Sequence, residues 1–445
     1  MRIKFCAAIF ALFLAVMPLY AAPKNDSVVV VISLDAFPAY ALKDPRLPIP
    51  TIRALARNGS IADSMRPINP TITWPNHTSL VTGVDASKHH VMFNGLLTYP
   101  ALNLPVKIEQ WRDKTDMVGV ETVYDAAFRA GLTTAQVDWV AIYNAKTITW
   151  QFPEIPNPDG KIERAMVDAN VVTQDQLRTF GKGSIAWRDR VWTEAAAYIL
   201  RTDRPNLMLF HLLDLDSTQH QYGPMNTASY NAMAFLDDRV KDIIEAVRAS
   251  GQLEKTTFLL MSDHGSREAK RAINLNVLLQ QNEIVHNADG HLTADAWVIP
   301  EGGCAMVYIS DPSKKSELLP KLQRLFEKVE GVKHVYDQEE YGKIGLPVKK
   351  DSDQSPDLFV SADEQHFFSD GTTGNVLTSV YQNGSHGFMN DDPQMQEIFI
   401  ASGAHIRRGI NLGSISNLRV APTIAKILGV SLPATTQSPL TDMLQ

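Results

Sequence analysis

The sequence predicts an α/β protein whose mostly parallel sheet is sandwiched by helices. Strand-like and helix-like segments alternate along the chain, which is the pattern of parallel strands joined by crossover helices. The run SVVVVISL at residues 27–34 is continuous and β-branched, as expected of a strand buried on both faces. The chain has 445 residues, 44% of them hydrophobic, enough for one large domain with a smaller insert.

Further elements follow from apolar periodicity and from the glycines that close helices. Helices are expected over residues 51–58, 120–130, 189–201, 228–249 and 419–428, and strands over 134–140, 206–212, 256–261 and 396–401. Glycines 59, 131, 251 and 429 come directly after four of these helices or within two residues of the end. The alternation supports a single sheet that collects strands from most of the chain.

The regular pattern loosens between Gly265 and Ser385, where we expect a smaller α+β unit. A helix is predicted over residues 314–329, with short strands over 304–309 and 357–360. The predicted organisation is a signal peptide at 1–21, a first core segment at 22–266, an inserted subdomain at 267–384 and a second core segment at 385–445.

The first residues are typical of a secretory signal. Arg2 and Lys4 precede an apolar run at 5–17, and Leu19-Tyr20-Ala21 offers a cleavage site. We expect cleavage after Ala21 and a periplasmic or secreted bacterial protein. The apolar run is short for a membrane span, and no second long one follows, so the mature chain is expected to lack a transmembrane segment.

The net charge and the number of cysteines indicate which partners and which cellular compartment suit the protein. The formal charge of −7 becomes two units more negative once Arg2 and Lys4 are removed, which argues against a nucleic-acid surface. Only Cys304 remains in the mature chain. It allows no intrachain disulfide, and this favours a bacterial periplasm over an animal extracellular space. Oligomeric state is not readable from the sequence.

The stretch at residues 70–77, PTITWPNH, is the most informative segment of the chain. Pro75 suits the start of a helix that Gly83 would end, so Thr73 is expected where that helix begins. Free backbone N–H groups and the helix dipole favour negative charge there, such as an alkoxide nucleophile or a bound phosphate. The structural alternative is a threonine that caps the helix.

Acidic residues and histidines follow three of the predicted strands. Asp35, Asp214 and Asp263 stand at strand ends, where ligands of open α/β sheets bind. Asp216 and His220 are four residues apart, so a helix would place them on one face; His264 adjoins Asp263, and His386 lies in a glycine-flanked loop. Mixed Asp and His ligands suit zinc, and six of them suit two ions that clamp a phosphoryl displacement.

With these residues in view, the chain resembles the nucleotide pyrophosphatase/phosphodiesterase (type I phosphodiesterase) family of the alkaline phosphatase superfamily. The matching motifs, in chain order, are Leu34-Asp35, MRPINPTITWPNH at 65–77, LVTG at 80–83, DSTQHQYGP at 216–224, SDHG at 262–265, GSHG at 384–387 and VAPTIAKIL at 420–428. The resemblance spans residues 28–430 and is weakest in the predicted insert. It implies an alkaline-phosphatase-like fold.

The resemblance also implies a role for each matching residue. One Zn²⁺ would be held by Asp35, Thr73, Asp263 and His264, and a second by Asp216, His220 and His386; other divalent metals stay open. Thr73 would be the nucleophile and form a phosphothreonine, and the second zinc would take up charge on the leaving oxygen and then activate water. Asn94 would donate to a nonbridging phosphate oxygen, with the Trp74 N–H as a second donor.

The chain departs from the family pattern beside the nucleophile. Trp74 stands where members usually carry Phe, a residue that often helps to form the leaving-group pocket. Trp74 could stack on a base or on a choline-like cation, or simply pack in the core. Tyr143, Trp150 and Phe152 are further candidates for this pocket. His89-His90 replaces the usual His-Gly pair, and we interpret both histidines as structural.

The predicted function is hydrolysis of nucleotide-type or phospholipid-headgroup phosphodiesters by a dizinc, Thr-dependent enzyme. One alternative is a phosphomonoesterase or phosphonate hydrolase on the same metals, for which Arg66 could clamp the extra charge. A second is a zinc-carrying binding protein without catalysis, which would be expected to have lost Thr73 or a ligand. The sulfatase motif Cys-x-Pro-x-Arg is missing around Cys304.

Overall fold

The computed structural model describes residues 26–288, 291–380 and 384–445. The predicted signal peptide, residues 1–21, lies outside the described residues. Within the described ranges, no helix combines the length and the apolar character needed to cross a bilayer.

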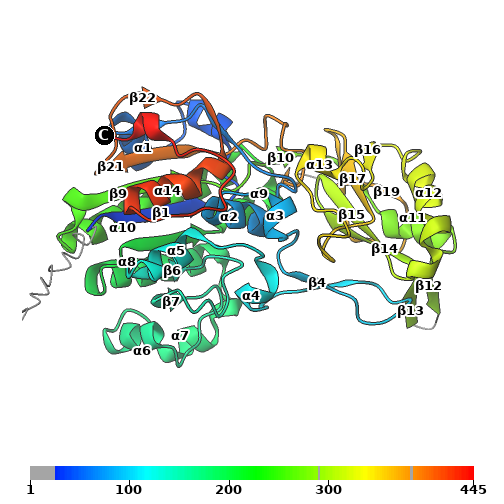
Figure 1. The fold of residues 1–445 in the computed structure, drawn as a ribbon, viewed down its shortest axis with the longest axis horizontal. Helices are drawn as coiled ribbons and strands as arrows, with labels where there is room; N and C mark the ends of the chain where they lie inside the picture. Colours follow the sequence, from blue (N-terminus) through cyan, green and yellow to red (C-terminus); the bar gives the residue numbers. More distant parts are fainter. Residues whose placement is uncertain (1–25, 289–290, 381–383) are drawn as a thin grey trace, which may run out of the picture.

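An eight-stranded sheet forms the centre of the molecule (Figure 1), in the order β22-β2-β21-β9-β1-β8-β6-β7. Its parallel strands are β9 (Thr256–Met261), β1 (Val28–Leu34), β8 (Leu207–Leu212), β6 (Thr134–Val137) and β7 (Trp150–Phe152). At the other edge, β21 (Phe399–Gly403) runs antiparallel to β9, followed by β2 (Ser60–Ile61) and β22 (Ile410–Asn411). The predicted fold class, α/β with a mostly parallel sheet, is therefore confirmed.

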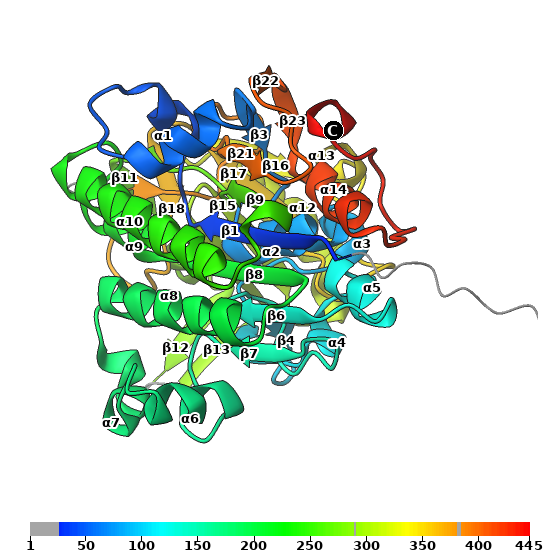
Figure 2. The ribbon, with the colours of Figure 1, turned by 90° about the vertical axis from the view of Figure 1, so that its left-hand side faces the viewer.

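Helices cover both faces of this sheet (Figure 2). Helices α1 (Pro50–Arg57), α8 (Ile185–Thr202) and α10 (Thr227–Ala249) pack on one face; α2 (Thr73–Thr82), α5 (Val123–Arg129) and α14 (Val420–Leu428) pack on the other. Strand β1 sends Val30 and Ile32 to the first face and Val29 and Val31 to the second. Because both faces are covered, every residue of β1 is buried, which explains its continuous apolar sequence.

A smaller antiparallel sheet lies beside the main one. Its order is β14 (Ala296–Glu301), β15 (Cys304–Ile309), β17 (Leu358–Ala362) and β16 (Val332–Tyr336). Helices α11 (Leu275–Gln281) and α12 (Lys315–Phe326) pack with it in a separate apolar core. The division of the chain at residues 267 and 384 stays a prediction.

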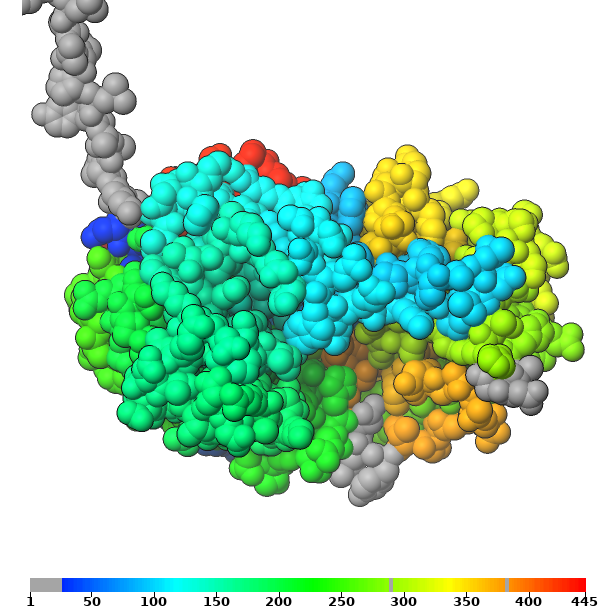
Figure 3. Space-filling model, turned by 90° about the horizontal axis from the view of Figure 1, so that it is seen from below, coloured from blue at the N-terminus to red at the C-terminus, as the bar shows by residue number. Residues whose placement is uncertain are grey.

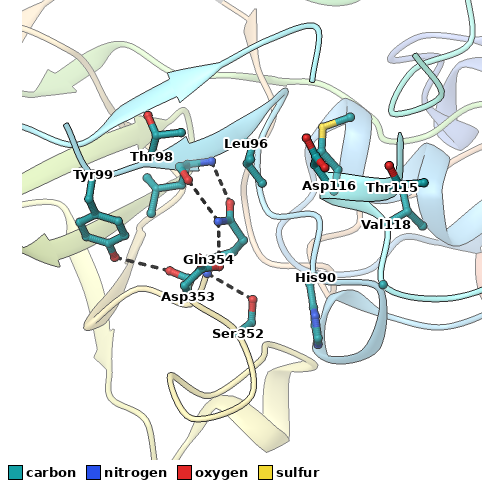
Figure 4. A pocket seen from close by; sticks show the side chains of 13 residues that line it. His90, Leu96, Thr98, Tyr99, Thr115, Asp116, Val118, Ser352, Asp353 and Gln354 are labelled. Atoms are coloured by element: carbon teal, nitrogen blue, oxygen red, sulfur yellow. Dashed lines mark hydrogen bonds between the residues drawn. The ribbon is translucent and has the colours of Figure 1, made fainter. Parts of the chain in front are cut away.

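A long arm connects the two sheets across one face of the molecule, where it is coloured cyan (Figure 3). It contains β4 (Leu96–Thr98) and β5 (Lys107–Glu109), and its Asn103 O accepts a hydrogen bond from Ala294 N at 2.9 Å. The Gln354 side chain binds the backbone N and O of Leu97 (Figure 4). A pocket of about 370 Å³ lies at this junction, and none of the predicted site residues lines it.

Several predicted boundaries are wrong by a few residues. The helix expected from residue 120 begins at Val123, because the Thr122 hydroxyl accepts from Asp125 N and caps it. The strand expected from residue 396 begins at Phe399, since the backbone of Glu397 bridges to Met65 instead. Helices α6 (Lys161–Asp168) and α7 (Gln174–Arg178) were not predicted.

His89 closes the short helix α3 (Ala86–His89) and is fully buried. Its Nδ1 accepts from Val91 N at 3.1 Å, so its Nε2 carries the proton and donates to the Ser79 hydroxyl, also at 3.1 Å. Burial, with a smaller contribution from His90, lowers the pKa of His89 to about 3. The folded protein therefore holds His89 neutral, as its structural interpretation requires.

We predict that this buried histidine makes the protein sensitive to acid. The unfolded chain takes up a proton on His89 below about pH 6.5 and the folded chain does not, so unfolding is favoured as the pH falls through that range. For one such group the loss is about 2 kcal/mol between pH 7 and 5. Urea titrations at pH 7 and pH 5 measure the unfolding free energy of the wild type and of His89→Gln. Between these pH values the unfolding free energy of His89→Gln should fall by about 2 kcal/mol less than that of the wild type.

The control is His291→Gln at an exposed histidine, whose ring is in water in both states. This variant should follow the wild type at both pH values. An equal drop for His89→Gln and the wild type would contradict the neutral, buried state of His89.

Candidate active site

The ends of three neighbouring strands meet at one edge of the sheet. Because β1 pairs in parallel with both β8 and β9, their carboxyl ends lie side by side. Asp35 follows β1, and Asp263-His264 follows β9. Ligand atoms of these three buried residues lie within 4.8 Å of one another, so they form one group that could hold a metal ion.

A second group forms on helix α9 (Asp214–Tyr222), which begins just after β8. Asp216 and His220 stand one turn apart on α9, and His386, directly after β20 (Gly384–Ser385), completes a group within 4.8 Å. The ring of His386 stacks on that of His264 at 4.1 Å between centroids. All six predicted ligands are therefore brought together, as two adjoining groups.

The three histidines of these groups all present Nε2 for ligand binding. Each Nδ1 lies at hydrogen-bond distance from a backbone carbonyl, His264 from Gly265 O (3.0 Å), His386 from Thr71 O (3.1 Å) and His220 from Gly384 O (2.9 Å). A carbonyl only accepts, so Nδ1 carries the proton and Nε2 keeps its lone pair. Such second contacts orient histidines that bind metals.

Two carboxylate oxygens in the first group have no hydrogen-bond partner among the described residues, although both are buried. They are Asp35 Oδ1 and Asp263 Oδ2. Buried acceptors without a donor are costly, and a cation between them would remove that cost. The donor set of carboxylate oxygens and imidazole Nε2 atoms fits zinc, so the residues present suit the expected metal.

The electrostatics of the residues in these groups support the same conclusion. Burial, followed by repulsion from Asp263 and Asp216, raises the pKa of Asp35 well above its ordinary value. Burial also opposes ionisation of Asp263, but His264 and His77 hold the pKa of Asp263 well below its usual range. Desolvation lowers the pKa of His386, and His264 and His220 lower it further. His386 is thus held neutral beside crowded carboxyl groups.

Thr73 lies at the junction of these groups. It is the first residue of α2, and its Oγ1 is 3.3 Å from His264 Nε2. The expectation that Thr73 lies where the helix begins is confirmed. The N-cap is Ile72, which makes no side-chain capping bond. The capping interpretation of Thr73 therefore fails. Gly83 ends the helix with φ 72°, as predicted.

Asn94 contacts the same helix end. The Trp74 N–H donates to Asn94 Oδ1 at 3.0 Å. Trp74 N was expected to donate to a phosphate oxygen, but in the structure it is taken up by this bond. Since an N–H must face an acceptor, the bond directs the Asn94 oxygen to Trp74 and leaves the amide nitrogen as a free donor.

An aromatic pocket adjoins Thr73 on the side of Trp74. Its lining includes Trp74, Trp111, Trp139, Tyr143, Gln151 and Glu154. Tyr143 was predicted to line the pocket; the prediction for Phe152 is wrong, because Phe152 is buried in the sheet core. Trp150 packs against that core and is also absent from the lining.

Sequence reasoning missed Trp111, Trp139 and His211. The first two reach the pocket from loops without a recognisable motif. His211 lies within an apolar strand and contacts Asp35 through Nε2 at 3.2 Å. A single histidine in a fully buried strand is the signal that would have identified it. Arg66, considered as a phosphate clamp, is exposed and lines a different pocket that contains none of the predicted site residues.

Several known proteins are similar to this chain. A family model described as type I phosphodiesterase/nucleotide pyrophosphatase matches residues 29–389. Human ectonucleotide pyrophosphatase/phosphodiesterase family member 1 is 25% identical over 255 residues, which cover 56% of this chain but only 24% of that protein. Human family member 7 is 24% identical over 408 residues, covering 87% of this chain and 77% of that protein.

Solved structures show the same fold. Murine ectonucleotide pyrophosphatase/phosphodiesterase 5, as an inactive variant in complex with AMP, superposes with a TM-score of 0.70 at 18% sequence identity. The match covers 94% of this chain and all of the murine chain. The human protein of the same name also gives a TM-score of 0.70.

Proposed function

Because the chain belongs to the type I phosphodiesterase/nucleotide pyrophosphatase family, we propose that it hydrolyses phosphodiesters with Thr73 as nucleophile and two zinc ions as cofactors. The observation that carries this proposal is the place of Thr73. Its hydroxyl lies at the start of a helix, 3.3 Å from Nε2 of His264, which belongs to one of two adjoining groups that could each hold a metal. A nucleophile, an electrostatic site and a substrate pocket thus adjoin one another.

We assign the proposed ligands to two zinc ions, one for each group of residues. Asp35, Thr73, Asp263 and His264 would hold one zinc ion, and Asp216, His220 and His386 the other. When bound, the two ions would supply positive charge, which favours an ionised threonine and a departing oxyanion.

The protein residues supply the covalent chemistry and the orientation. Thr73 Oγ gives up its proton to solvent and forms a bond to phosphorus while the bond to the leaving-group oxygen breaks; that oxygen takes up a proton from solvent, and a phosphothreonine ester remains. Water then attacks the phosphorus from the vacated side, the bond between phosphorus and Thr73 Oγ breaks, and a proton of that water restores the Thr73 hydroxyl as the phosphate product leaves. The positive end of the α2 dipole stabilises charge at Thr73. The Asn94 amide nitrogen, oriented through Trp74 N, donates to a nonbridging oxygen.

The aromatic pocket favours a substrate with a flat or cationic group next to the phosphate. Trp74 and Trp111 meet edge to face at 6.5 Å between centroids, and Glu154 lies in the same lining. Such a pocket suits a nucleobase or a choline-like headgroup. The murine relative bound to AMP and a Xenopus laevis relative named bis(5'-adenosyl)-triphosphatase, 21% identical over 416 residues, support the nucleotide class.

The alternatives receive less support. A monoesterase needs positive charge for the additional phosphate oxygen, and Arg66 is exposed outside the site. A binding protein without catalysis would not need the Thr73 hydroxyl beside the proposed metal ligands.

We further propose that residues 267–384 form an inserted subdomain, and that residues 1–21 direct export to the periplasm.

We predict that Thr73→Ala abolishes turnover of p-nitrophenyl diesters, with a loss of at least about 1000-fold in kcat. The variant should still bind two zinc ions, because six other ligands remain. Thr82→Ala is the matched control, since Thr82 is buried in the same helix and its hydroxyl, among the described residues, bonds only to Thr78 O. Full activity of Thr73→Ala would remove the nucleophile assignment.

We also predict that chelation abolishes activity and that added zinc restores it. Without the cations, repulsion among the carboxylates opposes ionisation of Thr73 and of the leaving oxygen. Initial rates before and after EDTA, followed by zinc titration, measure this. Activity that persists in metal-free enzyme would exclude the two-zinc proposal.

A panel of substrates separates the candidate classes. The comparison uses bis-p-nitrophenyl phosphate, the p-nitrophenyl ester of TMP, p-nitrophenylphosphorylcholine and p-nitrophenyl phosphate. We expect the highest kcat/KM for one of the two diesters with a base or a choline, and a loss of that preference in Trp74→Leu. A preference for the monoester would overturn the diesterase proposal.

A further inference from the structure

We propose that His211 is a positioning residue that holds Asp35 so that one carboxylate oxygen is kept free for the metal beside Thr73. This inference rests on the proposed function, because it concerns the same metal site. His211 belongs to none of the motifs that carry the family resemblance.

The register of the sheet places His211 next to Asp35. His211 pairs with Ser33 across β1 and β8, and Asp35 follows two residues later on the same face. Both side chains are buried beneath α2. The ring of His77, one turn along α2 from Thr73, lies 4.3 Å from the ring of His211 between centroids. His211 is thus packed directly behind the predicted metal ligands.

Both ring nitrogens of His211 have a defined neighbour. Nε2 lies 3.2 Å from Asp35 Oδ2, and Nδ1 lies 3.1 Å from the backbone oxygen of Asp138. A carboxylate oxygen can only accept, so Nε2–H donates to Asp35 Oδ2, while the other edge of the ring lies against the backbone oxygen and the carboxyl group of Asp138. Asp138 has φ 57°, a left-handed conformation that costs energy for a residue other than glycine and persists mainly where function requires it.

The contact with His211 divides the two oxygens of Asp35. Oδ2 faces His211, whereas Oδ1 lies 3.4 Å from His264 Nε2 and has no hydrogen-bond partner among the described residues. A metal-binding carboxylate is oriented in this way when its second oxygen is held by another side chain. Without that hold, the carboxyl group of Asp35 could rotate away from Asp263, which repels it.

A role in positioning predicts an effect on only one of the two metals. His211 contacts Asp35 and lies against His77, but within the described ranges it makes no hydrogen bond, ion pair or ring contact with Asp216, His220 or His386. A histidine that merely fills the core would instead affect overall stability and leave both metal affinities in place. Metal affinity, measured site by site, therefore separates the two roles.

The experiment compares His211→Asn with His211→Gln. The Asn amide reaches only as far as the position of Nδ1, whereas the Gln amide nitrogen can reach that of Nε2 and restore the contact with Asp35. Zinc is titrated into metal-free protein against a chromogenic chelator, and kcat and KM are measured on bis-p-nitrophenyl phosphate. Leu209→Ala is the packing control, because Leu209 is buried on the same strand and face but pairs with Val31, four residues before Asp35.

We expect wild type to bind two zinc ions and His211→Asn to bind one of them about 10–100-fold more weakly. Its kcat should fall with little change in KM, while His211→Gln stays close to wild type. Leu209→Ala should lose stability but keep both affinities. If His211→Asn does not fold, His211→Leu, which keeps the volume with an apolar group, takes its place.

Two results would overturn the inference, and they are distinguishable. Unchanged affinities in His211→Asn, with wild type binding two ions and hydrolysing the diester, would remove the role of His211 and leave the proposed function intact. A wild type that binds fewer than two ions or does not cleave the diester would remove the proposed function and this inference together.

Discussion

The parallel pairing of β1 with both β8 and β9 is the constraint on which the site depends. It aligns three strand ends at one edge of the sheet, so the residues that follow these strands lie close together. Asp35 and Asp263-His264 meet directly, and α9 starts close enough to β8 to add Asp216 and His220. Helix α2, packed on the same face, then brings Thr73 to the junction. The strands are held by apolar burial on both faces, so the site sits on a rigid support.

The same arrangement concentrates negative charge where water is excluded. Asp35 and Asp263 are fully buried, and each keeps one oxygen without a hydrogen-bond donor among the described residues. A chain would not gain stability from such a cluster by itself. Cations that bind only the folded protein would offset the cost, so folding and metal binding should be coupled. In this view the aromatic pocket, which contains neither Asp35 nor Asp263, is the region of the site that sets substrate preference.

The sequence was informative where chemistry lies in short local patterns. Strand ends and helical spacing located Asp35, Asp216, His220, Asp263 and His264, and β-branched runs located the central strands. Contacts between segments that are far apart in the chain could not be predicted from the sequence. Trp111 and Trp139 reach the pocket only through packing, and the bond from Trp74 N to Asn94 depends on the path of a loop. The role of His211 follows from sheet register, which a single strand cannot reveal.

The central claim is that one sheet edge and one helix end build a two-metal site around Thr73. Anomalous diffraction at the zinc edge from zinc-loaded crystals tests it most directly. The account predicts two peaks, one among Asp35, Asp263, His264 and Thr73 and the other among Asp216, His220 and His386. A single peak, or zinc bound only away from Thr73, would contradict it.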